Sequence, residues 1–262
     1  MVAAVLLASA PVLLAQSGAG RVDLRGVWTQ GGNVGFAPDA GADTAAREIA
    51  AGRVPRWRFT REDPPVTEWG RKRLDLNRET MMPNELGRNE RNALLYPYCL
   101  PEGMPRMMTI GTFEIIYGNG VVYLINERNH NIRRIYVDGK RHLEGMAPTF
   151  LGTSHGRWEG DSLFVETANI DSLNGWQWLD TFGDPMSDKL RVEERFRRLA
   201  ADQLQVEFLF DDPEAYTRPW KGTKVYTPEV DEYDMTENIT CSDHLREDFV
   251  NDMKSGNYRG KP

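Results

Sequence analysis

The sequence predicts a mainly β protein in which antiparallel strands form a sandwich or a barrel. From Gly111 onward, short segments of alternating apolar and polar residues follow one another roughly 8–15 residues apart. Turn-forming dipeptides such as Asn119-Gly120 and Asp138-Gly139 separate these segments, and few stretches have the period of a helix. Regularly spaced short strands with turn residues between them are typical of closed or sandwiched β architectures.

Before residue 111 we expect one strand and an irregular, partly helical excursion. The first strand covers Asp23 to Trp28. Residues 31–65 are rich in Gly, Ala and Pro and are expected to run over the surface. Thr67 is a good N-cap for a helix over residues 68–77. Repeated prolines over residues 78–109 predict an ordered segment without regular structure.

After residue 111 the pattern predicts enough strands to close a barrel with the one at Trp28. The strongest signal is a hairpin of residues 112–117 and 121–127, because Asn119-Gly120 lies between β-branched and aromatic runs. The tail over 242–253 has apolar residues at helical spacing and predicts a helix that packs on the barrel. The other strands are expected at 131–137, 149–152, 163–168, 189–198, 204–210, 223–227 and 229–234.

The chain has no internal repeat and no linker that would divide it, so we expect one domain over residues 20–262. Its predicted parts are an N-terminal strand with its excursion over 20–110, the main barrel strands over 111–240, and a C-terminal helix and tail over 241–262.

Residues 1–19 resemble a secretory signal peptide, since an apolar run from Val2 to Ala15 ends in small residues. The run is too short to span a bilayer, so we expect a periplasmic or secreted protein. Cys99 and Cys241 are the only cysteines, and in an exported chain they predict a disulfide. Two separate buried thiols are the alternative.

The charge of the chain argues against a nucleic-acid partner. The net charge is −7, and Lys and Arg are spread among acidic residues instead of forming a basic patch. A high aromatic content also distinguishes the composition from that of a disordered protein.

Six motifs follow one another along the chain, beginning at Asp23, Cys99, Arg133, Gly156, Asp188 and Asp212. Taken in order, they are similar to those of a broad family of uncharacterised secreted bacterial proteins. The pair Gly26 and Trp28 also resembles the Gly-x-Trp signature that opens lipocalin-like (calycin) barrels. The resemblance implies a lipocalin-like β-barrel with an N-terminal elaboration, in which Trp28 closes one end, and it implies no particular reaction.

One predicted strand carries candidate acid–base residues. Alternation places His130, Arg134 and Tyr136 on one face, and Glu127 can approach from the paired strand. If this face points into the barrel, a histidine oriented by a carboxylate beside an arginine is a workable set for isomerisation, hydration or elimination. If it points outward, it is an ordinary solvated sheet face.

A second group of candidates is aromatic and predicts a ligand-binding mouth. Aromatic side chains with a few polar groups are typical of small-molecule pockets. Two of the tryptophans lie in the long loop over residues 169–187, where a role in the core is harder to explain than a role as a lid. The predicted ligand-binding residues are Trp176, Trp178, Asp180, Tyr216, Trp220 and His155.

Other site classes lack their motifs in this sequence. His130, His142 and His155 are too far apart for a metal-binding pair on one helix or hairpin, so no metal is expected. There is no Gly-x-Ser-x-Gly elbow. Gly118-x-Gly120 is a hairpin turn and not a phosphate loop, so no cofactor is expected.

Two functions from different classes remain. The first is an exported β-barrel that binds a small, largely apolar or aromatic molecule. The alternative is a cofactor-independent acid–base enzyme of the isomerase, hydratase or lyase type, with its ionisable face inside the barrel. An envelope scaffold with a filled barrel is a third, blander possibility.

Overall fold

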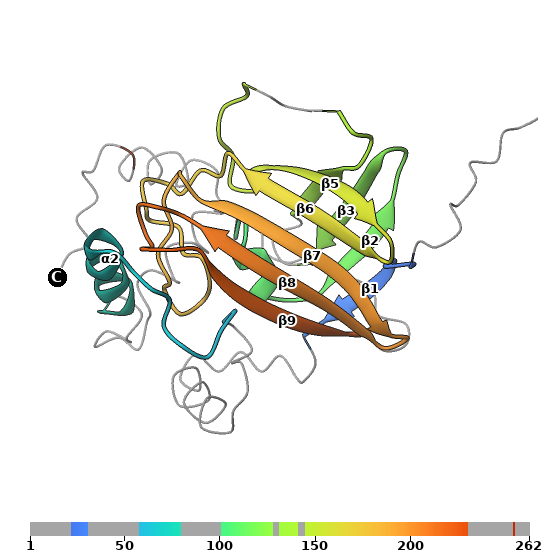
Figure 1. The fold of residues 1–262 in the computed structure, drawn as a ribbon, viewed down its shortest axis with the longest axis horizontal. Coiled ribbons are helices and arrows are strands. Elements are labelled where there is room, and N and C mark those ends of the chain that lie inside the picture. The colour runs from blue at the N-terminus through green and yellow to red at the C-terminus, as the bar shows by residue number, and fades with distance from the viewer. Residues whose placement is uncertain are drawn as a thin grey trace, which may run out of the picture.

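The computed structural model describes residues 22–30, 58–79, 101–127, 131–140, 145–229 and 254. Within these ranges nine strands close into a barrel, each hydrogen-bonded to the next in sequence and the last to the first (Figure 1). This mainly β architecture is compatible with a calycin-like fold. The strands are β1 (Gly26–Thr29), β2 (Phe113–Tyr117), β3 (Val121–Asn126), β4 (Ile132–Tyr136), β5 (Thr153–Glu159), β6 (Ser162–Ala168), β7 (Arg191–Ala200), β8 (Gln203–Asp211) and β9 (Trp220–Pro228).

The barrel is not antiparallel throughout, which corrects the prediction. β4 and β5 pair in parallel, through Ile135 with Ser154 and Tyr136 with His155. The connection over 137–152 returns the chain to the end of the barrel where β4 began, so β5 runs in the same direction. The strand expected at 149–152 is reduced to a single bridge from Thr149 to Ile170.

Alternation of apolar and polar residues explains which side chains fill the barrel. In β8, Leu204, Val206, Phe208 and Phe210 are buried while the residues between them are partly exposed. The other long strands follow the same rule, because successive side chains of a strand point to opposite faces. Burying one such side chain contributes about 1.5–3 kcal/mol, so the filled interior dominates the stability of the barrel.

One end of the barrel is closed by Trp28, as the Gly-x-Trp resemblance implies. Its indole ring is 1% exposed, and its Nε1 donates to the carbonyl of Leu24 at 2.9 Å. The guanidinium of Arg198 lies 5.2 Å from the centre of the indole and donates to the carbonyl of Asp23 at 2.9 Å. This end is therefore a packed and hydrogen-bonded plug.

At the opposite end, loops and helices gather beside the barrel (Figure 1). Helix α2 (Glu68–Glu79) begins where predicted, with the Thr67 hydroxyl accepting from the amide of Gly70 at 3.0 Å. The 3-10 helix η2 (Arg106–Thr109) is buried, and its Met108 carbonyl accepts from the Tyr226 hydroxyl at 2.6 Å. We call this the loop end of the barrel.

Several predictions fall outside the described residues. They concern the signal segment over 1–19, Cys99 and Cys241, His130, and the helix over 242–253. Within the described ranges, no helix has the length and apolar character needed to cross a membrane.

Candidate functional site

Of the two neighbouring arginines on β4, Arg133 is buried in the barrel and Arg134 is exposed on the outer face. Arg133 is 1% exposed, and its guanidinium makes a two-pronged ion pair with the buried carboxylate of Glu194 on β7. It also donates to the Ser154 hydroxyl on β5 at 3.1 Å and to the Thr167 hydroxyl on β6 at 2.8 Å. One side chain thus ties four strands together across the parallel seam, where only two residue pairs are in register.

Two of the predicted acid–base residues, Arg134 and Tyr136, lie on the outer face of β4. Arg134 is exposed on the outer face, and Tyr136 lies on the same face, with its ring centre 6.2 Å from that of His155. Glu127 follows β3, and its amide donates to the carbonyl of Thr112 at 2.9 Å. His130 lies outside the described residues, so the predicted set of four stays a prediction.

Four of the six predicted ligand-binding residues converge at the loop end. Trp178, Asp180, Tyr216 and Trp220 are all buried, with at most 5% of each exposed. The Tyr216 hydroxyl donates to the carbonyl of Pro185 at 2.5 Å, and its ring centre is 5.4 Å from that of Trp220. The loop tryptophan Trp178 is thus part of the packed interior.

The other two lie elsewhere. Trp176 is half-buried beside α2, where the guanidinium of Arg73 lies 5.7 Å from its ring centre and 5.6 Å from that of Trp69. His155 lies on the outer face of β5, next to Tyr136.

Residues 58–63 form a segment that we call the strap, and no sequence pattern predicts it. β1 pairs with β9 only through Thr227 and Pro228, at the end of that strand. The earlier residues of β9 have no partner in β1 along the same edge. The strap lies along this edge: the Thr223 amide donates to the Phe59 carbonyl, and the Lys224 ammonium donates to the Arg58 carbonyl, both at 3.0 Å. The strap therefore covers an opening between two strands of the barrel.

The Phe59 ring enters the barrel through this opening and is 1% exposed. Its centre lies 4.7 Å from that of Phe208 and 4.9 Å from that of Phe210. Gly222 supplies the space, because a Cβ there would lie 2.5 Å from the Cβ of Phe59. We call Phe208, Phe210 and Gly222 the aromatic seat, and Trp220 extends it with a ring 4.5 Å from Phe210.

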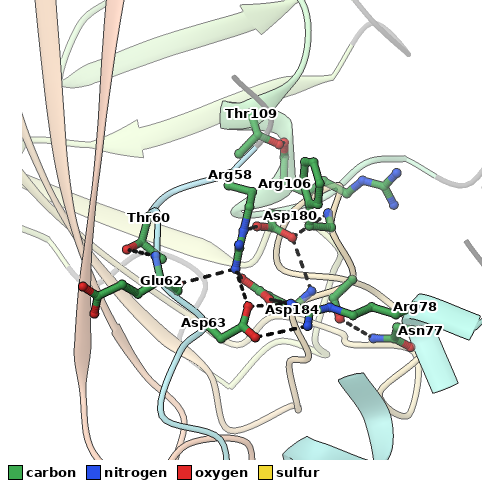
Figure 2. A network of polar contacts seen from close by, with 12 residues as sticks. Arg58, Thr60, Glu62, Asp63, Asn77, Arg78, Arg106, Thr109, Asp180 and Asp184 are labelled. Carbon is green, nitrogen blue, oxygen red and sulfur yellow. Dashed lines mark hydrogen bonds and ion pairs between the residues drawn. The ribbon is translucent and has the colours of Figure 1, made fainter. Parts of the chain in front are cut away.

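The neighbouring Arg58 enters a charged cluster of Arg58, Asp63, Arg78, Asp180 and Asp184 (Figure 2). Its Nη2 lies 3.1 Å from Asp63 and 3.5 Å from Asp184, and its Nε lies 3.9 Å from Asp180. Arg78 reaches Asp63 at 2.7 Å and Asp184 at 3.8 Å. Three carboxyl groups therefore share two guanidinium groups.

The loop after β6 fixes the two buried carboxyl groups of this cluster. Asp180 Oδ1 accepts from the amides of Phe182 at 2.8 Å and Asp184 at 3.3 Å, and the Leu179 amide donates to the Asp184 carbonyl at 2.8 Å. Both side chains have no exposed surface. Among the described residues, no N–H or hydroxyl donates to Asp180 Oδ2 or Asp184 Oδ1, and the two carboxyl groups hydrogen-bond to each other when one of them is protonated.

Burial controls the protonation of these groups. It raises the pKa of Asp184 well above its ordinary value, and the charge of Asp180 raises it further. Burial also raises the pKa of Asp180, opposed by the charge of Arg58. The hydrogen bonds from Arg78 lower the pKa of the more exposed Asp63 to about 2. The cluster thus contains one acid that ionises readily and two that resist ionisation.

A metal site is not evident in the described part of the chain, where no three His, Cys, Asp or Glu side chains are grouped to hold an ion.

Sequence reasoning missed the strap, Asp184 and Glu194. Arg58 and Phe59 follow a Gly- and Pro-rich stretch without periodicity, so nothing local indicated their burial. Glu194 lies between the apolar positions Val192 and Phe196, which share its inward face. A charged residue among the apolar, inward-facing positions of this strand was the one signal in the sequence.

Comparison with known proteins adds no family. No protein-family model matches the chain, and neither the curated proteins nor the solved structures searched contain a match.

Proposed function

We propose that this protein binds a small, largely apolar or aromatic molecule in the aromatic seat, in the periplasm or outside the cell. The observation that carries the proposal is that the protein's own Phe59 ring enters the seat through the open edge of β9. An aromatic group that arrives from outside the barrel wall occupies the place that a ligand would take.

The surroundings of the seat support binding of an aryl group. Edge-on and tilted contacts, with interplanar angles of 61° and 59° to Phe59, are geometries that aromatic rings favour. Gly222 leaves room where any other residue would fill the space. Pockets for small molecules are mostly apolar with a few polar groups, and the charged cluster lies beside this seat.

A ligand that enters the aromatic seat must displace the first residues of the strap. Two hydrogen bonds join these residues to β9, and Arg58 adds ion pairs with Asp180 and Asp184. A ligand must replace the burial of Phe59, which is worth about 1.5–3 kcal/mol. We therefore expect Phe59 to act as a tethered competitor.

Isothermal titration with indole tests this proposal. Removing the competitor in Phe59→Ala should tighten indole binding about tenfold or more relative to the unaltered protein. Phe196→Ala is the matched control, since Phe196 is equally buried but outside the seat. Equal binding by both variants would mean that any cavity suffices. A folded Phe59→Ala or Phe59→Leu protein that binds neither indole nor naphthalene would overturn the proposal.

A cofactor-independent acid–base enzyme of the isomerase, hydratase or lyase type remains the second candidate. The raised pKa of the Asp180 and Asp184 pair favours it, because a carboxylic acid that keeps its proton to a higher pH can serve as a general acid. A screen of small carbonyl and hydroxy compounds should then reveal turnover that Asp184→Asn removes. If His130→Ala or Arg134→Ala removed it instead, the set on that strand would be responsible.

A further inference from the structure

Arg58 and Phe59 are consecutive residues with different surroundings. The ring of Phe59 is in the aromatic seat, and the guanidinium of Arg58 is among the carboxyl groups of Asp63, Asp180 and Asp184. The strap therefore presents a positive charge beside an aromatic ring, and the barrel accommodates both. Resting on the proposed function, this pairing identifies the class of ligand.

We propose that the ligand is a cationic aromatic amine, whose aryl group replaces Phe59 and whose ammonium replaces the guanidinium of Arg58.

The balance of charge supports this choice. With the strap in place, two guanidinium groups face three carboxyl groups. Displacement of the strap removes Arg58 together with Asp63 and leaves Asp180 and Asp184, neither of which has exposed surface, with Arg78 as the remaining guanidinium of the cluster. The charge of Arg58 favours ionisation of these two buried acids, so a cationic ligand in its place restores that effect and a neutral ligand does not.

The orphaned oxygens give an independent reason. Asp180 Oδ2 and Asp184 Oδ1 are buried and accept from no N–H or hydroxyl among the described residues, even with Arg58 in place, and the two carboxyl groups hydrogen-bond to each other when one of them is protonated. The nearest guanidinium atoms lie 3.9 Å from Asp180 Oδ2 and 3.8 Å from Asp184 Oδ1, which is beyond hydrogen-bonding distance. A primary ammonium has three donors on a compact group, so it can approach both oxygens where the planar guanidinium does not.

The rings around the cluster suit a cation as well. The Arg58 guanidinium lies 5.6 Å from the centre of the Phe182 ring, within the range of a cation–π contact. An ammonium in the same place would keep this contact.

The test compares two probes that differ in one group, tryptamine and 3-(2-hydroxyethyl)indole, by isothermal titration at neutral pH. We expect tryptamine to bind at least tenfold more tightly to both the unaltered protein and Phe59→Ala. Asp184→Asn should remove most of this advantage and leave the affinity for the hydroxyl probe nearly unchanged. Asp180→Asn, which keeps an oxygen to accept from the amides of Phe182 and Asp184, provides a second variant that should reduce the advantage if Asp184→Asn does not fold.

The outcomes separate the two proposals. If neither probe binds Phe59→Ala, the proposed function itself fails. If both probes bind with equal affinity, the aromatic seat stands and the cationic ligand is wrong. A tryptamine advantage that survives in the folded aspartate variants would place the ammonium elsewhere and would also overturn this inference.

Discussion

The Arg133 and Glu194 pair gives the sharpest prediction about stability. Replacing Glu194 by Gln preserves the shape of the side chain but leaves a guanidinium that is 1% exposed without its counter-charge. Removing one partner of a buried ion pair costs about 3–5 kcal/mol, a large share of the 5–15 kcal/mol that stabilises a typical domain. We expect a loss of this size in urea unfolding at neutral pH, followed by tryptophan fluorescence.

The matched control replaces both charges, in Arg133→Met with Glu194→Leu. The hydroxyls of Ser154 and Thr167 would remain satisfied, because they lie 2.9 Å apart and hydrogen-bond to each other. The double variant should therefore recover most of the loss. A loss below about 1 kcal/mol in Glu194→Gln, or a double variant as unstable as the sum of the single ones, would refute the role of this pair at the β4–β5 seam.

Three further predictions concern the loop end. Trp178→Ala should cost about 3–5 kcal/mol because its ring is buried, whereas Trp176→Ala should cost only about 1 kcal/mol; similar losses in urea unfolding would contradict their different burial. Stability should also depend on pH in two directions. Asp63, with its pKa lowered to about 2, stabilises the fold above pH 3.8 and loses this effect as the pH falls toward 2. Asp184, with its raised pKa, favours the fold below pH 3.8 and disfavours it as the pH rises through its folded value, so Asp184→Asn should gain stability over the unaltered protein with rising pH. A pH-independent difference between the two proteins would disprove this. Thr67→Ala should cost about 1 kcal/mol by removing the N-cap of α2, and an unchanged unfolding midpoint would count against the cap.

Most of the strands follow from the sequence because their burial is local. The alternation in β8 and the Asn119-Gly120 turn between β2 and β3 are both properties of neighbouring residues. β5 escaped prediction because its inward positions include Ser154 and Gly156, which carry no apolar signal. Gly156 is required there, since a Cβ would lie 2.8 Å from Ile135.

The candidate site was less predictable because its contacts join distant parts of the chain. Trp178, Asp180, Tyr216 and Trp220 were chosen for their residue types, and the structure brings them to one end of the barrel. Which of the two alternating sets of β4 side chains faces inward depends on the closure of the whole barrel. Alternation alone does not show whether Arg133 or Arg134 is the buried one.

The contact of Phe59 with Gly222 has no local signature at all. It forms because β1 pairs with only two residues of β9, so that the strap can lie along the rest of that edge. How far β1 pairs with β9 depends on the complete sheet and not on neighbouring residues.

The most direct test of the account asks whether a ligand and Phe59 compete for the same place. Fluorine NMR of the protein with 4-fluorophenylalanine at position 59 would report the surroundings of that ring during titration with tryptamine. If tryptamine displaces the ring, a buried resonance should be replaced, as the site saturates, by one near the shift of the unfolded protein. A resonance that stays buried while tryptamine binds would contradict the claim that the strap occupies the ligand's site.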